Sequence, residues 1–480
     1  MGKYSVPEEI RKFKPKGTMV KVINGNKYYV YEYKSYKDEC GKRKTQMGKM
    51  IGKIIEGKGF IPNDTYACDG FITTLEYGQY KLIYENSKEV FQSLLDVFNY
   101  EDAARIYVMA LISYVNGYTS IKNFSKYYEQ SYLNIEFNGI KMGATSLSTL
   151  LDDLGRKGDK VNRFEENLIN SSSREIAVDG HVIPNYSLEN DLADYGNKYR
   201  QINDTQVNLI MGYDINSEKP LFSRFYAGSK LDKVSIKDIL ARKDLSNILF
   251  IVDRGFYSKE NIKMFSDNGN KYIIPLSQNL KVYKDVIDHF KLDDKFVYEA
   301  NKKKSIIEYK EFINNSSKVI IYRDQYQNMI ESADYLKNIE KKIAGFTKEK
   351  YEEISNFFGL IVLETNLDDK ASEIYFKYKQ RWKIETFYNF LKNKNGLEAI
   401  GESDYYKMQG ISFVTLIVGL IQSNIKKATK CISGKSISDI LLEARMVKLH
   451  YKNEHWYVEN TKKATLEMFA ALNSALEKEI

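Results

Sequence analysis

Five short runs rich in β-branched and other apolar residues follow one another between residues 174 and 276: REIAVDG, TQVNLIMGYD, KPLFSRFYAG, NILFIVD and KYIIPL. Runs of this length and composition are typical of buried strands. A helical stretch, VSIKDILARKD, precedes the fourth run. Strands that are joined through a crossover helix indicate an α/β domain built around a central sheet.

A sixth run of the same kind, FFGLIVLETN, follows at residues 357–366, after a lysine-rich and irregular stretch over residues 277–355. Because this run resembles the first five in composition, we interpret the stretch between them as an insertion into one α/β domain. The segment before residue 174 differs in texture. An alternating pattern around an Asn-Gly pair at residues 18–34 predicts a β-hairpin, and helical periodicity begins near residue 87.

These patterns divide the chain into six expected regions. They are a basic β-rich N-terminal unit (1–85), a helical DNA-binding or dimerisation region (86–170), the first part of a catalytic domain (171–275), an insertion (276–355), the second part of the catalytic domain (356–430) and a C-terminal region (431–480). A plain structural bundle is an equal alternative for the helical region, because short helices serve both purposes.

The net charge of +8 is concentrated at the N-terminus. Residues 1–60 contain 15 Lys and Arg against 6 Asp and Glu, a difference of 15 − 6 = +9. A basic module of this kind is typical of proteins that bind polyanions. The alternative is that lysine only keeps a small domain soluble, or that an AT-rich genome raises the lysine content.

Several classes of protein are disfavoured by composition. The opening MGKYSVPEEIRKFKPKG does not resemble a signal peptide, and the apolar run ISFVTLIVGLI is too short to span a bilayer. The 3 cysteines form no CxxC pair and the 4 histidines lack metal-ligand spacing, so neither a disulfide framework nor a zinc site is indicated. We expect an intracellular protein that does not associate with membranes.

Two aspartates end apolar runs: Asp179 in REIAVDG and Asp253 in NILFIVD. Ligands in α/β sheets bind at the carboxyl ends of strands, so both positions are candidates for a functional site. The alternatives are that Asp179 and Gly180 form a turn, and that Asp253 caps the following helix.

The segment YKQRWKIETFYNFLKNK, from Tyr378 to Lys394, carries a third acid within a helical pattern. At about 100° per residue, Arg381, Glu385 and Lys392 lie within about 60° of Tyr378 on one helix face. A separate apolar stripe is formed by Ile384, Phe387 and Leu391. The alternative for the polar face is a solvated surface with ion pairs such as Arg381–Glu385.

Together, Asp179, Asp253 and Glu385 predict a metal site. Clustered carboxylates repel one another unless a cation neutralises them, and Mg²⁺ prefers oxygen ligands. Two such ions activate a water or a 3′-hydroxyl and stabilise the leaving oxygen in phosphodiester displacement. Arg381 and Lys392 are then expected to hold neighbouring phosphates, and Tyr378 to hydrogen-bond a phosphate or stack on a base.

The chain resembles the DDE transposases of bacterial insertion sequences, in the broad family with a Tyr-(2)-Arg-(3)-Glu-(6)-Lys signature. Tyr378, Arg381, Glu385 and Lys392 match that spacing, and VDGHVIPNYS and FIVDRGFYSKENI resemble the segments of the first and second catalytic aspartates. A Gly-x-x-x-Asp turn, 228–232, resembles another family segment. The resemblance covers about residues 90–430. It implies a ribonuclease-H-like fold with a β-rich insertion.

The resemblance also implies a function. The expected protein binds the terminal inverted repeats of its own element as double-stranded DNA, nicks the ends by hydrolysis and joins the 3′-hydroxyls to target DNA. Two Mg²⁺ ions, for which Mn²⁺ is expected to substitute, would be held by Asp179, Asp253 and Glu385. A homodimer on paired ends in the bacterial cytoplasm, at the nucleoid, is expected.

Other functions stay open from the sequence. A metal-dependent DNA nuclease would cut without joining, and a domesticated DNA-binding relative would not need the three acids. A phosphohydrolase of small substrates is disfavoured by the basic N-terminus and by the lack of a phosphate-binding glycine-rich loop.

Overall fold

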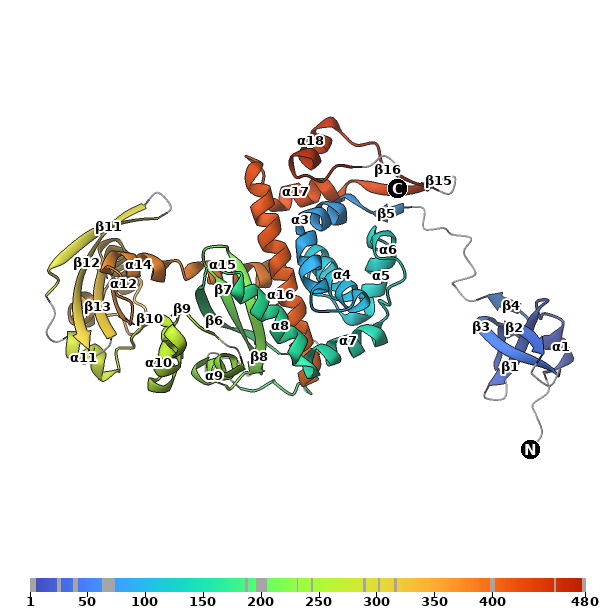
Figure 1. Cartoon of the computed structure of the whole chain (residues 1–480), viewed down its shortest axis with the longest axis horizontal. Helices are drawn as coiled ribbons and strands as arrows, with labels where there is room; N and C mark the ends of the chain where they lie inside the picture. The colour runs from blue at the N-terminus through green and yellow to red at the C-terminus, as the bar shows by residue number, and fades with distance from the viewer. Residues whose placement is uncertain are drawn as a thin grey trace. The chain divides into compact units, whose positions relative to one another are not determined.

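The computed structural model describes residues 6–23, 27–37, 42–62, 74–185, 189–195, 205–230, 232–242, 245–287, 291–300, 303–314, 317–397, 402–452 and 455–476. The chain divides into two compact units. One contains Met1–Thr74 with His450–His455, and the other contains Leu75–Leu449 with Trp456–Ile480. Figure 1 shows the elements of each unit.

The first unit contains an antiparallel sheet with strand order β1-β2-β3-β4. After the short α1 (Glu8–Arg11), its strands are β1 (Thr18–Ile23), β2 (Lys27–Lys37), β3 (Arg43–Ile55) and β4 (Gly59–Pro62). Pairing of Ile23 with Lys27 confirms the predicted hairpin, although its Asn-Gly turn lies outside the described residues. Ile10, Val30 and Ile54 form the buried core of this unit.

Helices fill the segment between the first strands and the central sheet. They are α3 (Gly78–Leu95), α4 (Tyr100–Asn116), η1 (Ile121–Asn123), α5 (Phe124–Glu129), α6 (Leu133–Glu136), α7 (Ala144–Arg156) and α8 (Gly158–Asn170). The first of them starts eight residues before the expected boundary at 86. Its opening turns bury Tyr80, Leu82 and Ile83, a pattern that the polar Gln79 and Lys81 beside them hide in the sequence.

A nine-stranded sheet, ordered β11-β12-β13-β14-β10-β9-β6-β7-β8, forms the centre of the second unit. The five strands from the predicted apolar runs are β6 (Glu175–Pro184), β7 (Gln206–Asp214), β8 (Lys219–Ala227), β9 (Leu249–Val252) and β10 (Lys271–Pro275). β6, β7 and β8 are antiparallel neighbours, whereas β9 runs parallel to both β6 and β10. The mixed α/β architecture is as predicted.

Short helices connect these strands. They are α9 (Asp232–Arg242), η3 (Arg254–Phe256), α10 (Lys259–Ser266) and η4 (Asp267–Gly269). The apolar face of α9 and α10 packs on one side of the sheet in a buried cluster that includes Ile236, Ile239 and Phe265.

The predicted insertion continues the same sheet. After α11 (Lys281–Ile287), its strands are β11 (Asp294–Ala300), β12 (Lys303–Asn314) and β13 (Ser317–Asp324), followed by α12 (Gln325–Glu340), α13 (Lys348–Ile354) and η5 (Ser355–Phe357). The sixth apolar run forms β14 (Leu360–Thr365), which pairs antiparallel with β10 on one side and β13 on the other. The inserted strands therefore extend the central sheet through β14.

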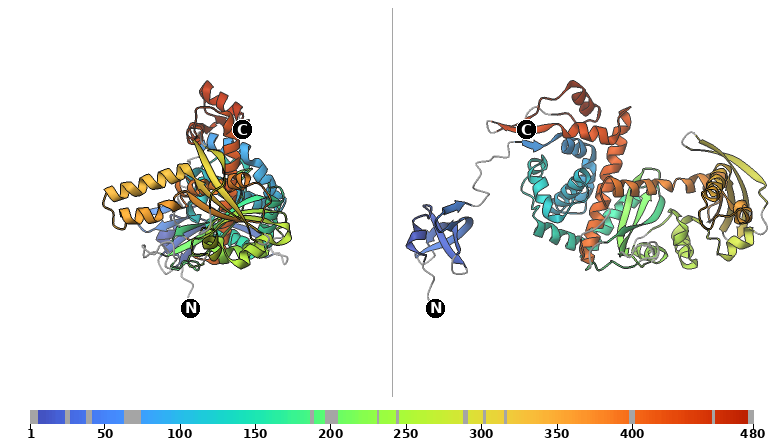
Figure 2. Two further views of the ribbon diagram at one scale, coloured as in Figure 1. Left: turned by 90° about the vertical axis from the view of Figure 1, so that its left-hand side faces the viewer. Right: turned by 180° about the vertical axis from the view of Figure 1, so that it is seen from behind.

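Helix α16 (Tyr405–Ala428) contacts α3, α4 and α7 as well as β8, so it joins the helical region to the sheet (Figures 1 and 2). With the following turn it is long and apolar enough to cross a membrane by length and composition. The sequence analysis counted only the 11-residue apolar run, but the helix is longer because flanking polar residues continue it. However, 83% of the apolar window is buried inside the protein.

The C-terminal region contains both helices and strands. The elements are η6 (Thr429–Cys431), α17 (Ile437–Arg445), β15 (Lys448–Lys452), β16 (His455–Val458) and α18 (Lys463–Ala471). The strands form a small sheet of order β16-β15-β5, in which β5 is Thr74–Glu76.

Candidate active site

The register between β6 and β9 places the two candidate aspartates side by side. The last parallel pair joins Val178 to Val252, and Asp179 and Asp253 each follow directly. Neighbouring strands lie about 4.8 Å apart, so the two carboxylates extend from adjacent positions of one sheet edge. Asp253 follows the end of β9 and is half-buried.

Asp179 does not end its strand, contrary to the expectation from sequence. β6 continues to Pro184, and Asp179 pairs with Met211 across β7. The Asp-Gly pair is thus part of a strand and forms no turn. The sequence misled because the parallel partner β9 stops at Val252, whereas the antiparallel partner β7 continues along β6.

The predicted helix 378–394 is broken near its beginning. α14 (Ala371–Lys379) and α15 (Trp382–Asn393) are separated by Gln380 and Arg381. Backbone hydrogen bonds of the 3₁₀ type bridge the break, from Arg381 N to the Tyr378 carbonyl and from Ile384 N to the Arg381 carbonyl. Neither glycine nor proline marks this position, so sequence reasoning missed it. The predicted apolar stripe of Ile384, Phe387 and Leu391 is buried.

Arg381 contacts two of the three candidate acids. Its Nη2 donates to Glu385 Oε1 at 2.5 Å, and its Nη1 lies 3.7 Å from Asp179 Oδ2. Burial would lower the pKa of Arg381, but Tyr378, Asp179, Glu385 and Asp253 together raise it. All three acids therefore act on one guanidinium. We call Asp179, Asp253, Glu385 and Arg381 the acidic cluster.

One N–H group of Arg381 is available to donate a further hydrogen bond. Within the part of the chain that the structure describes, its Nε is buried without a hydrogen-bond partner. Tyr378 lies beside it, with the guanidinium carbon 6.0 Å from the ring centroid. Burial raises the pKa of Tyr378, the positive charge of Arg381 lowers it, and Asp253 and Glu385 raise it further. Tyr378 and Arg381 are thus brought to the same place as the acids.

Lys392 is not brought into this cluster by any contact among the described residues. It is exposed on α15, seven residues after Glu385, which corresponds to about 10 Å along the helix axis. Glu385 itself is half exposed, with 50% of its side chain accessible. A solvent-facing lysine about two turns from an accessible acid on the same helix suits a long ligand that runs along the helix.

Sequence reasoning missed Tyr388, which fastens α15 to the sheet. Its hydroxyl donates to the Asp179 carbonyl at 2.8 Å and to the Leu209 carbonyl at 3.2 Å. The ring of His181 stacks on it at 4.9 Å, and burial raises the pKa of Tyr388 strongly. The available signal was a tyrosine at position +3 from Glu385 within an otherwise apolar stripe.

Asp232, at the start of α9, is a fourth acid near the two aspartates. Asn208 Nδ2 donates to its Oδ1 at 2.8 Å. A Cβ added to Gly180 would lie 2.7 Å from Asp232 Oδ1, and one added to Gly255 would lie 3.3 Å from Oδ2. The carboxylate therefore fills the space beside the residue after Asp179 and the loop after Asp253. The Gly-x-x-x-Asp turn that ends at Asp232 was one signal in the sequence, and the glycines at positions 180 and 255 were another.

The chemistry of the acidic cluster fits a hard divalent cation. Its three acids offer only carboxylate oxygens, the ligand type that Mg²⁺ prefers. Among the described residues no group of three or more acids, histidines or cysteines is close enough to hold a metal ion. Instead the guanidinium of Arg381 lies against Asp179 and Glu385 and supplies the positive charge there.

Comparison with family models matches residues 170–404 to the family described as "Transposase DDE domain". The chain carries a transposase DDE domain. The resemblance drawn from the sequence is thereby confirmed at the level of DDE transposases. The matched residues begin just before β6, include the insertion and end before α16, so they contain the whole acidic cluster. The ligand roles of its residues stay a prediction.

Two other comparisons are weaker. The cryo-EM structure of a piggyBac transposase synaptic complex with hairpin DNA is 9% identical, with a TM-score of 0.38, over 77% of this chain and 78% of that one. Merozoite surface protein 1 from two isolates of Plasmodium falciparum is 25% identical over 201 residues, which is 35% of this chain. The match spans 12% of the length of those relatives.

Proposed function

We propose that this protein is the transposase of a bacterial insertion sequence. It binds the terminal inverted repeats of its element and catalyses metal-dependent cleavage and strand transfer of DNA. The observation that carries the proposal is the acidic cluster inside a transposase DDE domain. Its two aspartates are in register on parallel strands, and Arg381 pairs with both Asp179 and Glu385 of α15.

The topology supports a ribonuclease-H-like catalytic core, which the family resemblance implies. In the order β8-β7-β6-β9-β10, the strands β8, β7 and β6 are antiparallel neighbours, and β9 and β10 run parallel to β6. This arrangement brings Asp179 and Asp253 to one edge, and Tyr388 fastens α15 against that edge. The acids thus come from three elements that the fold holds together.

Asp179, Asp253 and Glu385 would hold two Mg²⁺ ions, or Mn²⁺ in their place. When bound, the ions supply charge stabilisation at the attacking and leaving oxygens of an in-line phosphodiester displacement. In the first step, water attacks the phosphorus and the 3′-oxygen leaves as a hydroxyl. In the second step, that 3′-hydroxyl attacks a target phosphodiester and a new 3′-oxygen leaves.

The remaining signature residues would position DNA. With Asp179 and Glu385 holding a divalent cation, the guanidinium of Arg381 would be free to bind a phosphate in bidentate fashion. The buried Nε of Arg381, which has no hydrogen-bond partner within the described chain, is an available donor for the same group. Tyr378 would hold a neighbouring phosphate or base, and Lys392 would contact the strand farther along α15.

The proposed partners are double-stranded DNA, at the element ends and at the target, and a second copy of the chain on paired ends. The excess of nine positive charges in residues 1–60 supports DNA contacts by the N-terminal unit. We place the protein in the bacterial cytoplasm at the nucleoid, where its DNA lies. The alternative is a metal-dependent nuclease, which would leave free ends in a strand-transfer assay.

The test is Glu385→Gln, which keeps size and helix preference but removes the negative charge. Mg²⁺-dependent cleavage of element-end DNA should fall by several orders of magnitude, while gel-shift binding without metal stays equal or improves. Improvement is expected because an acid that faces phosphates repels them. Glu467→Gln is the matched control, because Glu467 is another glutamate in an i,i+4 pair, on α18. Cleavage by Glu385→Gln at the wild-type rate would contradict the proposal.

A further inference from the structure

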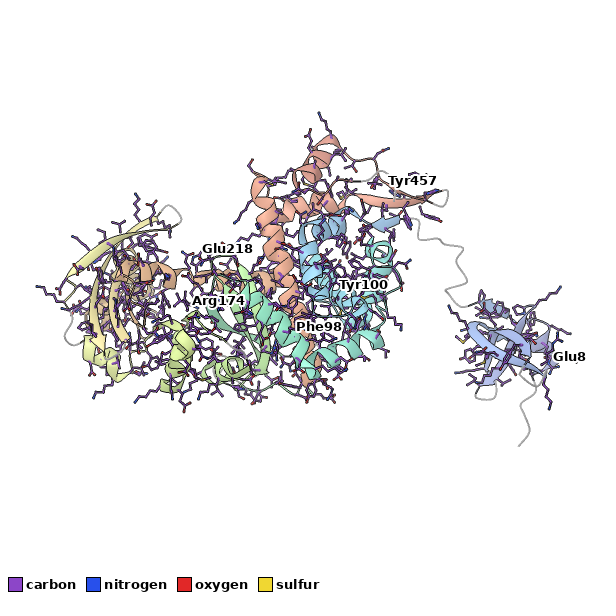
Figure 3. All side chains as sticks on the ribbon, viewed as in Figure 1. Glu8, Phe98, Tyr100, Arg174, Glu218 and Tyr457 are labelled. Atoms are coloured by element: carbon purple, nitrogen blue, oxygen red, sulfur yellow. The ribbon has the colours of Figure 1, made fainter. Side chains whose placement is uncertain are left out.

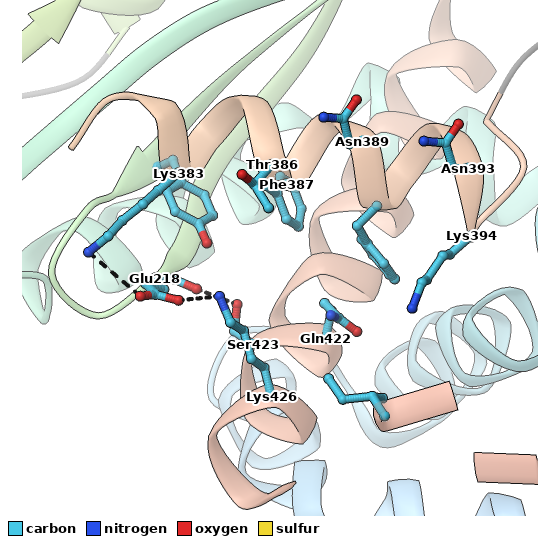
Figure 4. A pocket seen from close by; sticks show the side chains of 13 residues that line it. Glu218, Lys383, Thr386, Phe387, Asn389, Asn393, Lys394, Gln422, Ser423 and Lys426 are labelled. Carbon is cyan, nitrogen blue, oxygen red and sulfur yellow. Dashed lines mark hydrogen bonds and ion pairs between the residues drawn. The ribbon is translucent and has the colours of Figure 1, made fainter. Parts of the chain in front are cut away.

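A pocket of about 360 Å³ is lined by residues of α15 that do not belong to the acidic cluster (Figure 4 shows the lining residues). It is bounded by α15, by α16 and by the turn between β7 and β8, with Ile437 from α17 at one end. Its polar lining residues are Glu218, Lys383, Thr386, Asn389, Asn393, Lys394, Gln422, Ser423 and Lys426. The pocket plays no part in the chemistry described above.

Three lysines and one acid are among the residues that line the pocket. Lys426 forms an ion pair with Glu218, and Lys383 Nζ lies 3.6 Å from the same carboxylate (Figure 4). Lys394 Nζ donates to Ser438 Oγ at 3.0 Å. We call Lys383, Lys394, Lys426 and Glu218 the basic cluster. Its formal charge of 3 − 1 = +2 is the reverse of what a metal site needs, and it favours an anionic ligand.

Glu218 is held in an unusual conformation. Its φ of +55° lies in the left-handed region, which side-chain-bearing residues rarely adopt (the side chain is labelled in Figure 3). Its carbonyl accepts a hydrogen bond from Ser423 Oγ at 2.6 Å, which pins the turn to α16. Burial alone would raise the pKa of Glu218, but Lys426, Lys383 and Lys430 lower it. The turn thus presents a carboxylate to lysines from two helices.

A polar stripe on α15 connects the two clusters. At about 100° per residue from Glu385, Asn389 lies near 40°, Asn393 near 80° and Lys383 near 160°. Asn389 and Asn393 are exposed, and within the described chain neither side chain has a hydrogen-bond partner. Along the helix axis these amides lie towards Lys394 and away from Lys383, so a DNA strand that runs from Glu385 along α15 meets them before it reaches Lys394.

We propose that this pocket binds backbone phosphates of the DNA strand next to the cleavage site, and that Glu218 occupies the phosphate position until DNA arrives. The proposal rests on the proposed function and adds a second DNA contact to it. Carboxylate and phosphate present similar oxygen acceptors to lysine. Phosphates that displace Glu218 satisfy Lys383 and Lys426, and the strain at the β7–β8 turn can then relax. The contact reads the backbone and carries no base specificity.

Binding of an element-end duplex to the full-length protein, measured over a salt series without metal, tests the proposal. Each lysine–phosphate contact contributes about 0.9 to the slope of log K on log salt. Lys426→Met should reduce that slope by about one contact and lower affinity about threefold or more. Glu218→Gln should raise affinity by a similar factor, because it leaves the lysines free.

The double variant Glu218→Gln with Lys426→Met decides between local and general charge effects. If Glu218 acts by occupying Lys426, most of the gain from Glu218→Gln disappears in the double variant. The matched controls are Glu467→Gln and Lys463→Met, an exposed ion pair on α18 with the same two residue types. Simple net charge predicts additive effects equal to those of the controls, and this result would overturn the proposal.

Failure of this proposal is distinguishable from failure of the proposed function. Should the wild-type protein not bind or cleave element ends, the transposase proposal itself is wrong. Should it bind while the salt slope of Lys426→Met matches that of Lys463→Met, only the pocket is excluded. Lys426 is about half exposed, with 46% of its side chain accessible, so Lys426→Met is expected to fold even if Glu218→Gln does not.

Discussion

Helix α15 borders two charge clusters of opposite composition. In the acidic cluster Arg381 contacts two of three acids, and in the basic cluster Glu218 contacts two of three lysines. The formal charges are 1 − 3 = −2 and 3 − 1 = +2. In each case a single side chain of the minority sign contacts members of the majority from different elements.

The difference indicates which ligand each cluster needs. Side chains of like charge are costly to hold together, and one counter-charge offsets this cost only in part. The remaining charge of −2 suits a divalent cation, whereas +2 suits two singly charged phosphates. We infer that Arg381 and Glu218 have equivalent roles, because each occupies the ligand position of its cluster when no ligand is bound. Four predictions test this equivalence, beginning with the largest effect.

Asp179→Asn and Asp253→Asn should abolish the response of the acidic cluster to metal. Cleavage should fall by several orders of magnitude, because each change removes a charge that balances the cation. Ligands stabilise the state that binds them, so added Mg²⁺ should raise the Tm of the wild-type protein and leave that of the variants unchanged. Asp153→Asn on α7 is the control. A Tm that rises equally in all proteins would show that Mg²⁺ binds elsewhere.

Asp232→Asn should weaken the same cluster indirectly. The carboxylate of Asp232 lies next to Gly180 and Gly255, so it supports the segments that carry Asp179 and Asp253. Supporting residues of metal sites typically change metal affinity or activity by about 10- to 100-fold. The Mg²⁺ concentration that gives half-maximal cleavage should therefore rise, with a smaller change in the rate at saturating Mg²⁺. A loss of rate that excess Mg²⁺ does not restore would instead indicate direct participation.

Tyr388→Phe should separate the position of α15 from its charges. The change leaves the carbonyls of Asp179 and Leu209 without their buried donor, which costs about 1–3 kcal/mol. Chemical denaturation measures this loss, and cleavage should fall along with it because Glu385 is no longer held against β6. Tyr128→Phe, which also removes a buried hydroxyl-to-carbonyl bond, is the control. It should lose similar stability without losing cleavage beyond that.

Much of the fold was predictable because its signals are local. The apolar runs identified β6 to β10 and β14, and the acids at their ends identified Asp179 and Asp253. The pairing of β14 with β13 was not predictable, because it joins the insertion to the catalytic sheet through tertiary contacts. The start of α3 at Gly78 was missed for the same reason, since its buried residues pack on distant helices.

The candidate site was predictable in residue type but not in arrangement. The spacing of Tyr378, Arg381 and Glu385 indicated a shared face, yet the break at Gln380 and Arg381 places them on two helices. The ion pair Arg381–Glu385, which was the alternative interpretation, is present, and Arg381 also contacts Asp179. The ion pair of the alternative interpretation is thus present, and the metal-binding interpretation stays a prediction. The basic cluster was invisible because Glu218 is far from α15 and α16 in sequence.

The smallest expected effect concerns pH and compares Glu218 with Glu364, a buried glutamate on β14 that accepts hydrogen bonds from Tyr272 and Tyr257. Burial raises the pKa of Glu364, and the hydrogen bonds offset this only in part, whereas the lysines lower the pKa of Glu218. The signs are therefore opposite. Stability from Glu364 is present below the unfolded pKa of about 4.3 and is lost as pH rises through the raised folded pKa.

Stability from Glu218 is present above the unfolded pKa and is lost as pH falls through the lowered folded pKa. Thermal unfolding of Glu364→Gln and Glu218→Gln, from acidic pH below the unfolded pKa of about 4.3 up to neutral pH, measures both terms against the wild-type protein. Relative to the wild-type, Glu364→Gln should gain stability as pH rises, whereas Glu218→Gln should lose it. Parallel curves for the two variants would mean that the lysines do not hold Glu218 as an ion. The basic cluster would then no longer be the counterpart of the acidic one.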